Sequence, residues 1–265
     1  PTSLTNRDVL KQSASLFDTM GLLSPVHVQA KIFIQQLWSH KCTWDEALSP
    51  ALAAQWLQIS AELISARTTM INRKYFICSP SDVVELHVFC DASKCAYGAA
   101  AYLRYKQSTA LVMAKTRVKP LKAISLPRLE LLATVIGARL ANFVKSALRD
   151  SSVMIIQSIL WTDSQITLHW IACEKSLPVF VSNRVREVNN ANFVAHLHCA
   201  SKDNPADLLT RGITTKQLQQ SSLWWHGPQW LAEFVRPSPP IATETVLPCL
   251  SDCCEVDTPN MPSQQ

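Results

Sequence analysis

The chain has 265 residues, of which 48% are apolar and 17% charged, and its formal net charge is +5. This length allows one to three domains, and this apolar content can fill a hydrophobic core. The mild positive charge permits a polyanionic partner without identifying one. No apolar run approaches the roughly 20 residues that span a bilayer, and no signal-peptide pattern is found, so a membrane protein is not expected. The start at Pro1 favours a piece of a larger protein.

Cysteine usage indicates the redox setting. The chain has nine cysteines, an odd number, and several of them, such as Cys90 and Cys199, lie within apolar runs. A reduced intracellular protein is therefore expected rather than a disulfide framework. Cys249, Cys253 and Cys254 lack a fourth ligand, so no zinc site is predicted there.

Residues 1–80 are predicted to be a mostly helical segment. Thr5 or Asn6 can cap a first helix that Gly21 would end. Ser24-Pro25 and Ser49-Pro50 indicate two further helix starts, because proline fits the first helical turn. Residues 71–78 are expected to form a short strand, followed by a break at 79–82 that we interpret as a domain boundary.

Residues 81–215 are predicted to be an α/β domain. Three strands with short links favour an antiparallel meander, and alternating helices and strands follow it. In order, the expected elements are strands 83–89, 96–105 and 110–118, a helix from Ser125-Leu126-Pro127 to Leu148, a strand 155–162, a helix from Ser164, a helix 178–188, a strand 193–200 and a short helix from Asn204-Pro205 to Gly212. Residues 216–235 are aromatic-rich, and the Pro-, Ser- and Thr-rich residues 236–265 are expected to be disordered.

Carboxylates recur at strand ends and in early helix turns. Asp91 and Asp163 end two strands, whereas Glu130 and Asp207 lie in the first turns of two helices. Each one alone is explained by capping or by the helix dipole. If the first and fourth strands are neighbours, however, Asp91 and Asp163 lie side by side, and the other two can approach them. Four such carboxylates would repel one another without cations, which predicts bound Mg²⁺ or Mn²⁺. Two ions about 4 Å apart could activate water against a phosphodiester.

Basic residues precede the helix that carries Glu130. They are either a solvated face or a surface that contacts phosphates, and their spacing does not decide between the two. These residues are Lys115, Arg117, Lys119, Lys122 and Arg128.

The ordered motifs resemble the RNase H domain of BEL/Pao-type retrotransposon Pol proteins. The resemblance extends roughly over residues 4–232 and includes the linker between polymerase and RNase H and the stretch before integrase. The motifs are Val88-Phe89-Cys90-Asp91-Ala92-Ser93, Leu126-Pro127-Arg128-Leu129-Glu130-Leu131, Leu160-Trp161-Thr162-Asp163-Ser164, Asn204-Pro205-Ala206-Asp207, the segments 15–25 and 44–46, and the stretch 223–231.

This resemblance implies an RNase H-like fold, a mixed five-stranded sheet with helices on both faces, and hydrolysis of RNA in RNA–DNA hybrids. It assigns catalysis and two Mg²⁺ ions, which Mn²⁺ can replace, to Asp91, Glu130, Asp163 and Asp207. It further implies Pol domains such as reverse transcriptase and integrase as partners, no membrane, no small-molecule cofactor, and a cytoplasmic particle or the nucleus as location. The expected nucleic-acid contacts are Ser93, Lys115, Arg117, Lys119, Arg128, Ser164 and Asn204.

Two positions depart from the family pattern. Thr19-Met20 stands where the family usually has Pro-Leu, in the linker and not in the site. The loop from Cys199 to Asp207 has no histidine, although many RNase H enzymes carry one there. The chain also lacks a polymerase Tyr-x-Asp-Asp motif and an integrase pattern, so reverse transcription is not expected of it alone.

Three alternatives were weighed against a hybrid ribonuclease. A catalytically silent or domesticated Pol fragment that still binds nucleic acid stays open. An aspartic protease is rejected, because Asp18-Thr19, Asp91-Ala92-Ser93 and Asp163-Ser164 all lack the glycine of Asp-Thr/Ser-Gly. A transposase or integrase core is disfavoured, because its glutamate comes last, whereas here Glu130 is second and Asp207 last.

Overall fold

The computed structural model describes residues 4–40, 43–72, 74–76, 82–151 and 153–234. Residues Pro1–Glu233 form one compact unit, which contains every helix and strand given below. The predicted disordered tail 236–265, the three cysteines considered for zinc, and most of the predicted break at 79–82 lie outside the described residues. Within them, Cys90, Cys95, Cys173 and Cys199 are free thiols.

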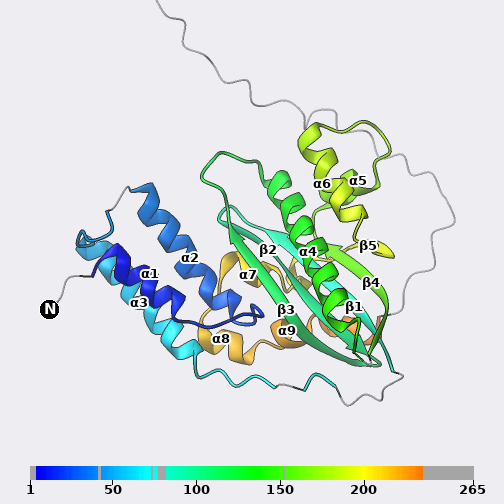
Figure 1. Cartoon of the computed structure of the whole chain (residues 1–265), viewed down its shortest axis with the longest axis horizontal. Helices are drawn as coiled ribbons and strands as arrows, with labels where there is room; N and C mark the ends of the chain where they lie inside the picture. The colour runs from blue at the N-terminus through cyan, green and yellow to red at the C-terminus, as the bar shows by residue number, and fades with distance from the viewer. Residues whose placement is uncertain (1–3, 41–42, 73, 77–81, 152, 235–265) are drawn as a thin grey trace, which may run out of the picture. The chain divides into compact units, whose positions relative to one another are not determined.

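A five-stranded mixed sheet in the order β3-β2-β1-β4-β5 is the centre of the fold (Figure 1). The strands β1, β2 and β3 form the predicted antiparallel meander, whereas β4 pairs parallel with β1 and β5 parallel with β4. The five-stranded sheet expected from the sequence is therefore confirmed. The strands are β1 (Val83–Ala92), β2 (Ala96–Tyr105), β3 (Ser108–Val118), β4 (Met154–Thr162) and β5 (Ala195–His198).

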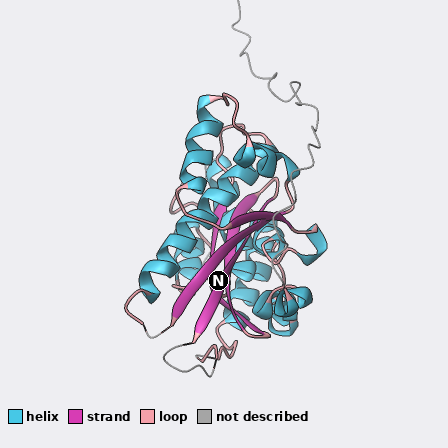
Figure 2. Ribbon diagram, turned by 90° about the vertical axis from the view of Figure 1, so that its right-hand side faces the viewer, coloured by secondary structure: helices cyan, strands magenta, loops and turns pink. Residues whose placement is uncertain are grey.

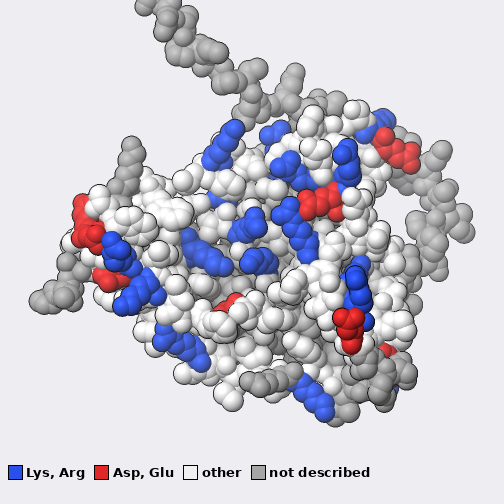
Figure 3. Space-filling view, in the orientation of Figure 1, with Lys and Arg blue, Asp and Glu red and all other residues white. Residues whose placement is uncertain are grey.

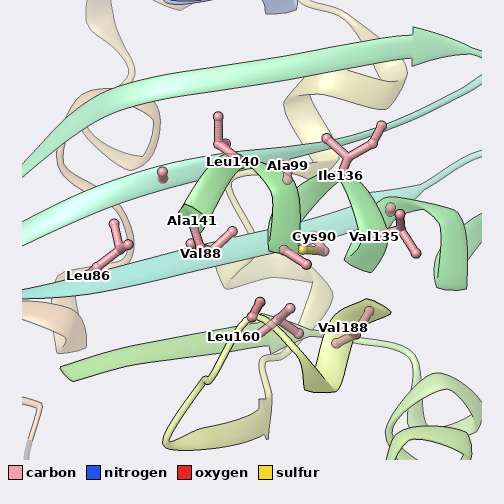
Figure 4. Close-up of a cluster of buried hydrophobic side chains, with 14 of the residues drawn as sticks. Leu86, Val88, Cys90, Ala99, Val135, Ile136, Leu140, Ala141, Leu160 and Val188 are labelled. Atoms are coloured by element: carbon pink, nitrogen blue, oxygen red, sulfur yellow. The ribbon is translucent and has the colours of Figure 1, made fainter. Parts of the chain in front are cut away.

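Helix α4 (Leu126–Leu148) covers one face of the sheet, with the bounds expected from the sequence. Leu86, Val88 and Cys90 alternate along β1 and are fully buried in the core beneath α4 (Figure 4). Gly137 permits the close approach, because a Cβ there would lie 2.5 Å from the Cys90 sulfur. Tight packing of this kind fixes the position of α4, and hence of Glu130, relative to the strand ends.

By length and composition alone, helix α4 could cross a membrane. The sequence analysis did not predict this, because polar residues interrupt the apolar run. Its most apolar window is 56% buried within the protein. Such a window also occurs in the core helices of globular domains, and the packing of α4 on β1 and β2 is that of a core helix. It was the only helix of this kind found in the part of the chain that the structure describes.

Helices cover both faces of the sheet, as Figure 2 shows from the side. The helices α5 and α6 follow β4, and α7, α8 and α9 follow β5. The helix and strand types predicted after β4 are confirmed, with ends that differ by one to three residues. The bounds are α5 (Gln165–Ala172), α6 (Val179–Asn189), η1 (Ser201–Asp203), α7 (Asp207–Arg211), α8 (Thr215–Gln220), α9 (Ser222–His226) and η2 (Gln229–Glu233).

The aromatic stretch near the C-terminus belongs to the core of this unit. Trp224 is fully buried, and its carbonyl accepts a hydrogen bond of 2.7 Å from the Tyr102 hydroxyl on β2. Trp230 packs against Trp161 and Phe89, with ring centroids 4.8 and 6.3 Å away. The stretch that resembles a run-up to integrase therefore closes the second face of the sheet. The division into domains proposed from the sequence remains a prediction.

Three N-terminal helices form a layer of which α2 packs against the edge strand β3, while α1 and α3 pack against α2 (Figure 1). They are α1 (Asn6–Ala14), α2 (Ser24–Ser39) and α3 (Pro50–Ala66). Thr5 caps α1 through a capping box with Asp8, as one of the two predicted caps. The helix ends at Ala14, before the predicted end at Gly21. The predicted strand at 71–78 is wrong where the structure describes it, because residues 71–72 and 74–76 have no regular structure.

The turn before α2 explains the motif Asp18-Thr19-Met20-Gly21. The Asp18 carboxylate accepts hydrogen bonds from the backbone nitrogens of Leu22 and Leu23 at 2.8 and 2.9 Å. Gly21 has a φ of +73°, and Ala114 of β3 donates its N–H to the Met20 carbonyl at 2.8 Å. This motif therefore joins the helical segment to the edge of the sheet.

Candidate active site

The first and fourth strands, β1 and β4, are neighbours in the sheet. This is the arrangement that the sequence analysis required for Asp91 and Asp163 to lie side by side. Cys90 of β1 pairs in register with Thr162 of β4, and each is followed directly by an aspartate. Asp91 and Asp163 thus lie at the same carboxyl edge of two parallel strands. In open α/β sheets, this edge is where ligands usually bind.

Asp91 is nearly buried, with 5% of its surface exposed. Its pKa is raised to about 7, first by burial and then by the charges of Asp163 and Asp207, while the hydrogen bond from the Thr210 hydroxyl opposes the rise. That hydroxyl donates to Asp91 Oδ2 over 2.6 Å. The Asp91 carboxyl is therefore close enough to two other predicted site carboxylates, Asp163 and Asp207, for their charges to affect its pKa.

Glu130 enters the site from the first turns of α4. Ser164 donates its hydroxyl hydrogen to Glu130 Oε2 over 2.5 Å. The Ser164 hydroxyl oxygen also caps α5, because it accepts the Thr167 N–H at 3.1 Å. Burial raises the pKa of Glu130, and the charge of Asp163 adds to the rise. Ser164 thus connects the α4 carboxylate to the end of β4.

Asp163 and Asp207 also have donors within the chain. Ser201 donates its hydroxyl hydrogen to Asp163 Oδ2 at 2.6 Å. On α7, Arg211 forms an ion pair with Asp207 one turn earlier, with 2.5 Å between Nε and Oδ1. Each of the four carboxylates therefore accepts a hydrogen bond from a hydroxyl or a guanidinium.

The four side chains suit a hard divalent cation, since the ligand atoms that they offer are carboxylate oxygens. The raised pKa of Asp91 has the physical cause expected of acids gathered without a cation: burial beside like charges. The side chains are not arranged as a metal centre, however, because no three His, Cys, Asp or Glu residues within the described ranges form a group that could hold a metal ion. The four residues therefore suit a metal ion in their chemical type and in their position at one edge of the sheet. Their carboxylates, however, accept hydrogen bonds from groups within the protein.

The predicted basic residues lie at the end of β3, in the loop that follows it and at the start of α4. Lys115, Arg117 and Arg128 are exposed, and Lys119 is partly exposed. The guanidinium of Arg128 lies 5.2 Å from the centre of the Phe180 ring. Figure 3 shows Lys and Arg side chains gathered over the region between α2 and α4.

Three residues predicted to contact nucleic acid form hydrogen bonds within the protein. Asn204 is 1% exposed and donates its amide to the Cys90 carbonyl at 3.0 Å. Ser93 closes a turn by accepting the Cys95 and Ala96 N–H groups, and its hydroxyl lies 3.1 Å from the Thr210 carbonyl. Ser164 is buried and engaged with Glu130. These hydrogen bonds hold the three side chains in place within the protein, and their contact with nucleic acid stays a prediction.

Sequence reasoning missed Thr210, Arg211 and Ser201. A helical spacing could have indicated the first two, since positions three and four residues after Asp207 share its helix face. Ser201 had no such signal, because its contact with Asp163 depends on how the loop after β5 folds.

The strand order, the α4 crossover from β3 to β4 and the carboxylates at the ends of β1 and β4 define an RNase H-like domain. The family model described as "Pao retrotransposon-like RNaseH-like domain" matches residues 5–164, more than half of the 265 residues. The chain belongs to this family. The matched range contains Asp91, Glu130 and Asp163 and ends before Asp207.

Solved structures with similarity to this chain include the RNase H1 of the halophilic archaeon Halobacterium salinarum, with 13% identity, a TM-score of 0.35, and coverage of 52% of this chain and 99% of that one. LC11-RNase H1 in complex with an RNA/DNA hybrid has 10% identity, a TM-score of 0.34 and coverages of 51% and 99%. The foamy viral protease-reverse transcriptase in complex with an RNA/DNA hybrid has 8% identity, a TM-score of 0.40 and coverages of 73% and 27%. The search of curated proteins gave no match.

Proposed function

We propose that this chain hydrolyses the RNA strand of RNA–DNA hybrids with divalent metal ions, as part of a retrotransposon Pol protein. The observation that carries the proposal is that Asp91 and Asp163 directly follow the paired residues Cys90 and Thr162 at one edge of the sheet. The charge of Asp163 raises the pKa of both Asp91 and Glu130, and that of Asp207 raises the pKa of Asp91. Membership of the Pao RNaseH-like family supports it.

Asp91, Glu130, Asp163 and Asp207 would hold the metal ions. When bound, two such ions supply an activated water and stabilise the leaving oxygen of a phosphodiester. The hydroxyls of Thr210, Ser201 and Ser164 keep the carboxylates oriented toward this edge of the sheet. Arg211 pairs with Asp207 through Oδ1, which leaves Oδ2 as the oxygen that would face a metal ion.

The exposed basic residues on β3 and α4 would hold the phosphates of the hybrid. Contacts to phosphates fix register and carry no sequence information, so the specificity would come from the shape of the hybrid. Lys115, Arg117 and Arg128 are exposed and Lys119 is partly exposed, and Figure 3 shows Lys and Arg side chains gathered between α2 and α4. Reverse transcriptase and integrase domains of the same Pol remain the proposed partners.

Cleavage of a labelled RNA–DNA hybrid in Mg²⁺ and in Mn²⁺ tests the proposal. We expect Asp91→Asn and Asp163→Asn to reduce cleavage to the background while hybrid binding in EDTA persists. Asp150→Asn is the matched control, because Asp150 is an exposed aspartate in the turn after α4. Unchanged cleavage in both site variants would exclude this assignment.

A catalytically silent fragment that binds nucleic acid is the second candidate. The ion pair between Arg211 and Asp207 favours this candidate. So does the finding that, among the residues that the structure describes, no three His, Cys, Asp or Glu side chains form a group that could hold a metal ion. Binding of the hybrid by the wild-type chain without turnover in either metal would support this candidate.

A further inference from the structure

Helix α7, which carries Asp207, is too short to be stable by itself. It has five residues, and no side chain caps its N-terminus. Isolated helices shorter than about 12–15 residues are marginal in water, so the position of α7 depends on its neighbours. The helix packs against β1 and β2 on one side and against α2 on the other (Figure 1).

The contacts with the sheet hold the middle of α7. Leu209 is fully buried. The Thr210 hydroxyl donates to Asp91, and the Thr210 carbonyl accepts the Ser93 hydroxyl at 3.1 Å. The C-terminal end of α7, in contrast, is held from the N-terminal helices.

Two hydrogen bonds join the end of α7 to α2. Gln29 donates its side-chain amide to the Arg211 carbonyl at 2.5 Å, and Ile213 donates its N–H to the Pro25 carbonyl at 3.1 Å. The last carbonyls of a helix have no partner inside the helix, and Gln29 supplies a donor to one of them. A residue of α2 therefore closes the helix that carries Asp207.

Glu62 of α3 holds the start of α8 in a similar way. Thr215 is 2% exposed, and its N–H donates to the Glu62 carboxylate at 2.7 Å, while its hydroxyl donates to the Glu62 carbonyl at 2.9 Å. A buried N–H that loses its acceptor is costly. Beside these contacts, a cavity of about 400 Å³ extends between Gln29, Glu62 and Gly212. Hydrogen bonds, rather than close packing, therefore fix residues 212–215 against α3.

We propose that Gln29 and Glu62 are positioning residues for Asp207. They bind the backbone at the end of α7 and at the start of α8, and so keep the Asp207 carboxylate at the edge of the sheet where Asp91 lies. The N-terminal helices thus belong to the scaffold of the candidate active site. This inference rests on the proposed function, because it takes Asp207 as a metal ligand.

Mn²⁺ binding, measured by isothermal titration calorimetry, tests the two positioning residues separately from cleavage. We expect Gln29→Ala and Glu62→Ala each to weaken Mn²⁺ binding about threefold to tenfold, the range that the loss of one hydrogen bond gives. Glu62→Gln keeps an acceptor for the Thr215 N–H and should bind Mn²⁺ as the wild type does. Gln58→Ala is the matched control, because Gln58 is exposed on α3 and lines the same cavity.

Amide hydrogen exchange without metal measures the position of α7 directly. Residues 208–213 should exchange about threefold to tenfold faster in Gln29→Ala and Glu62→Ala than in Gln58→Ala, because local opening of this segment becomes easier. Exchange in β1 and β4 should stay at the wild-type rate. Exchange that is faster in β1 to the same extent would show a general loss of stability and would overturn the positioning role.

The outcomes separate the positioning role from the hydrolysis. If Gln29→Ala and Glu62→Ala match Gln58→Ala in Mn²⁺ affinity, the positioning role is wrong, even where the wild-type chain cleaves the hybrid. Weaker Mn²⁺ binding with unchanged exchange of residues 208–213 would also contradict it. If both variants bind Mn²⁺ more weakly, exchange faster at 208–213 and the wild-type chain does not cleave, the positioning role stands and the hydrolysis is wrong. A wild-type chain that binds no Mn²⁺ overturns both.

Discussion

The Thr210 hydroxyl on α7 donates a hydrogen bond of 2.6 Å to Asp91 Oδ2 at the end of β1, across 119 residues of sequence. Both side chains are nearly buried, at 1% and 5% exposure. This bond gives a desolvated carboxylate an internal donor and joins the helix that carries Asp207 to the strand that carries Asp91. One hydroxyl thus relates two of the proposed metal ligands.

Replacing this hydroxyl should destabilise the fold. In Thr210→Val, Asp91 loses a donor in a buried setting, so we expect the free energy of unfolding to fall by about 1–3 kcal/mol. Thr210→Ser keeps the hydroxyl and should retain most of the wild-type value. Urea unfolding at pH 8 in EDTA measures the difference. A loss in Thr210→Ser with none in Thr210→Val would mean that the methyl group, rather than the hydrogen bond, stabilises this position.

The raised pKa of Asp91 predicts a pH-dependent stability in EDTA. Its pKa is about 7 in the folded protein against 3.8 for an ordinary aspartate, so the folded state binds the proton more tightly than the unfolded state. The contribution of Asp91 to the free energy of unfolding should therefore fall as the pH rises from about 4 to about 7, and it should stay level above that. The difference between 3.8 and about 7 amounts to roughly 4 kcal/mol.

Asp91→Asn is the variant that isolates this effect, because the amide stays neutral at every pH. We expect thermal or urea unfolding to show the variant more stable than the wild type at pH 8 and close to it at pH 4. Asp150→Asn, an exposed control, should keep the wild-type pH profile. A wild-type profile that rises between pH 5 and pH 7 while Asp91→Asn stays flat would contradict the raised pKa.

The sheet and the pair of aspartates were predictable from sequence because they depend on local patterns. Apolar runs of strand length alternate with one clear amphipathic helix, and short links between the first three strands leave few topologies. Once β4 is placed beside β1, Asp91 and Asp163 must meet, because parallel neighbours end at the same edge. The positions of Glu130 and Asp207 followed from capping patterns at the starts of α4 and α7.

Side-chain direction was not predictable in the same way. Ser93, Ser164 and Asn204 stand next to site aspartates in sequence, which favoured a role in ligand contact. The structure turns their polar atoms to the Thr210 carbonyl, to Glu130 and to the Cys90 carbonyl. Those partners lie 34 to 117 residues away, so no local pattern indicates them. The strand predicted at 71–78 failed for a related reason, since apolar composition alone supplies no neighbouring strand to pair with.

Gly21 should tolerate no side chain. Its φ of +73° is unfavourable for other residues, and a Cβ would lie 1.9 Å from the Ala114 carbonyl oxygen of β3. We expect Gly21→Ala to lower the free energy of unfolding by about 3 kcal/mol or more, because both the turn and the contact with the edge strand must shift. Met20→Ala, next to it and 38% exposed, should cost much less. Urea unfolding of both variants checks the ranking, and similar midpoints would show that the turn can relax away from β3.

The aromatic stretch after α8 should be required for stability of the RNase H-like sheet. Trp224 is fully buried; its indole nitrogen donates to the Leu22 carbonyl at 2.8 Å, and its own carbonyl accepts from Tyr102. It therefore connects the C-terminal stretch, the turn before α2 and the strand β2. We expect Trp224→Ala to cost about 3–5 kcal/mol, the usual range for removing a large buried aromatic side chain.

Trp38→Ala is the matched control for this change, because Trp38 is 55% exposed on α2. It should stay within roughly 1 kcal/mol of the wild type, since most of its surface is already in contact with water. Thermal and urea unfolding measure both variants. If the stretch were only a linker toward a following domain, Trp224→Ala would behave like Trp38→Ala, and a chain ending at Gln220 would unfold at the wild-type midpoint. The packing of Trp224 beneath Tyr102 predicts the opposite, a chain that loses its cooperative transition when that segment is removed.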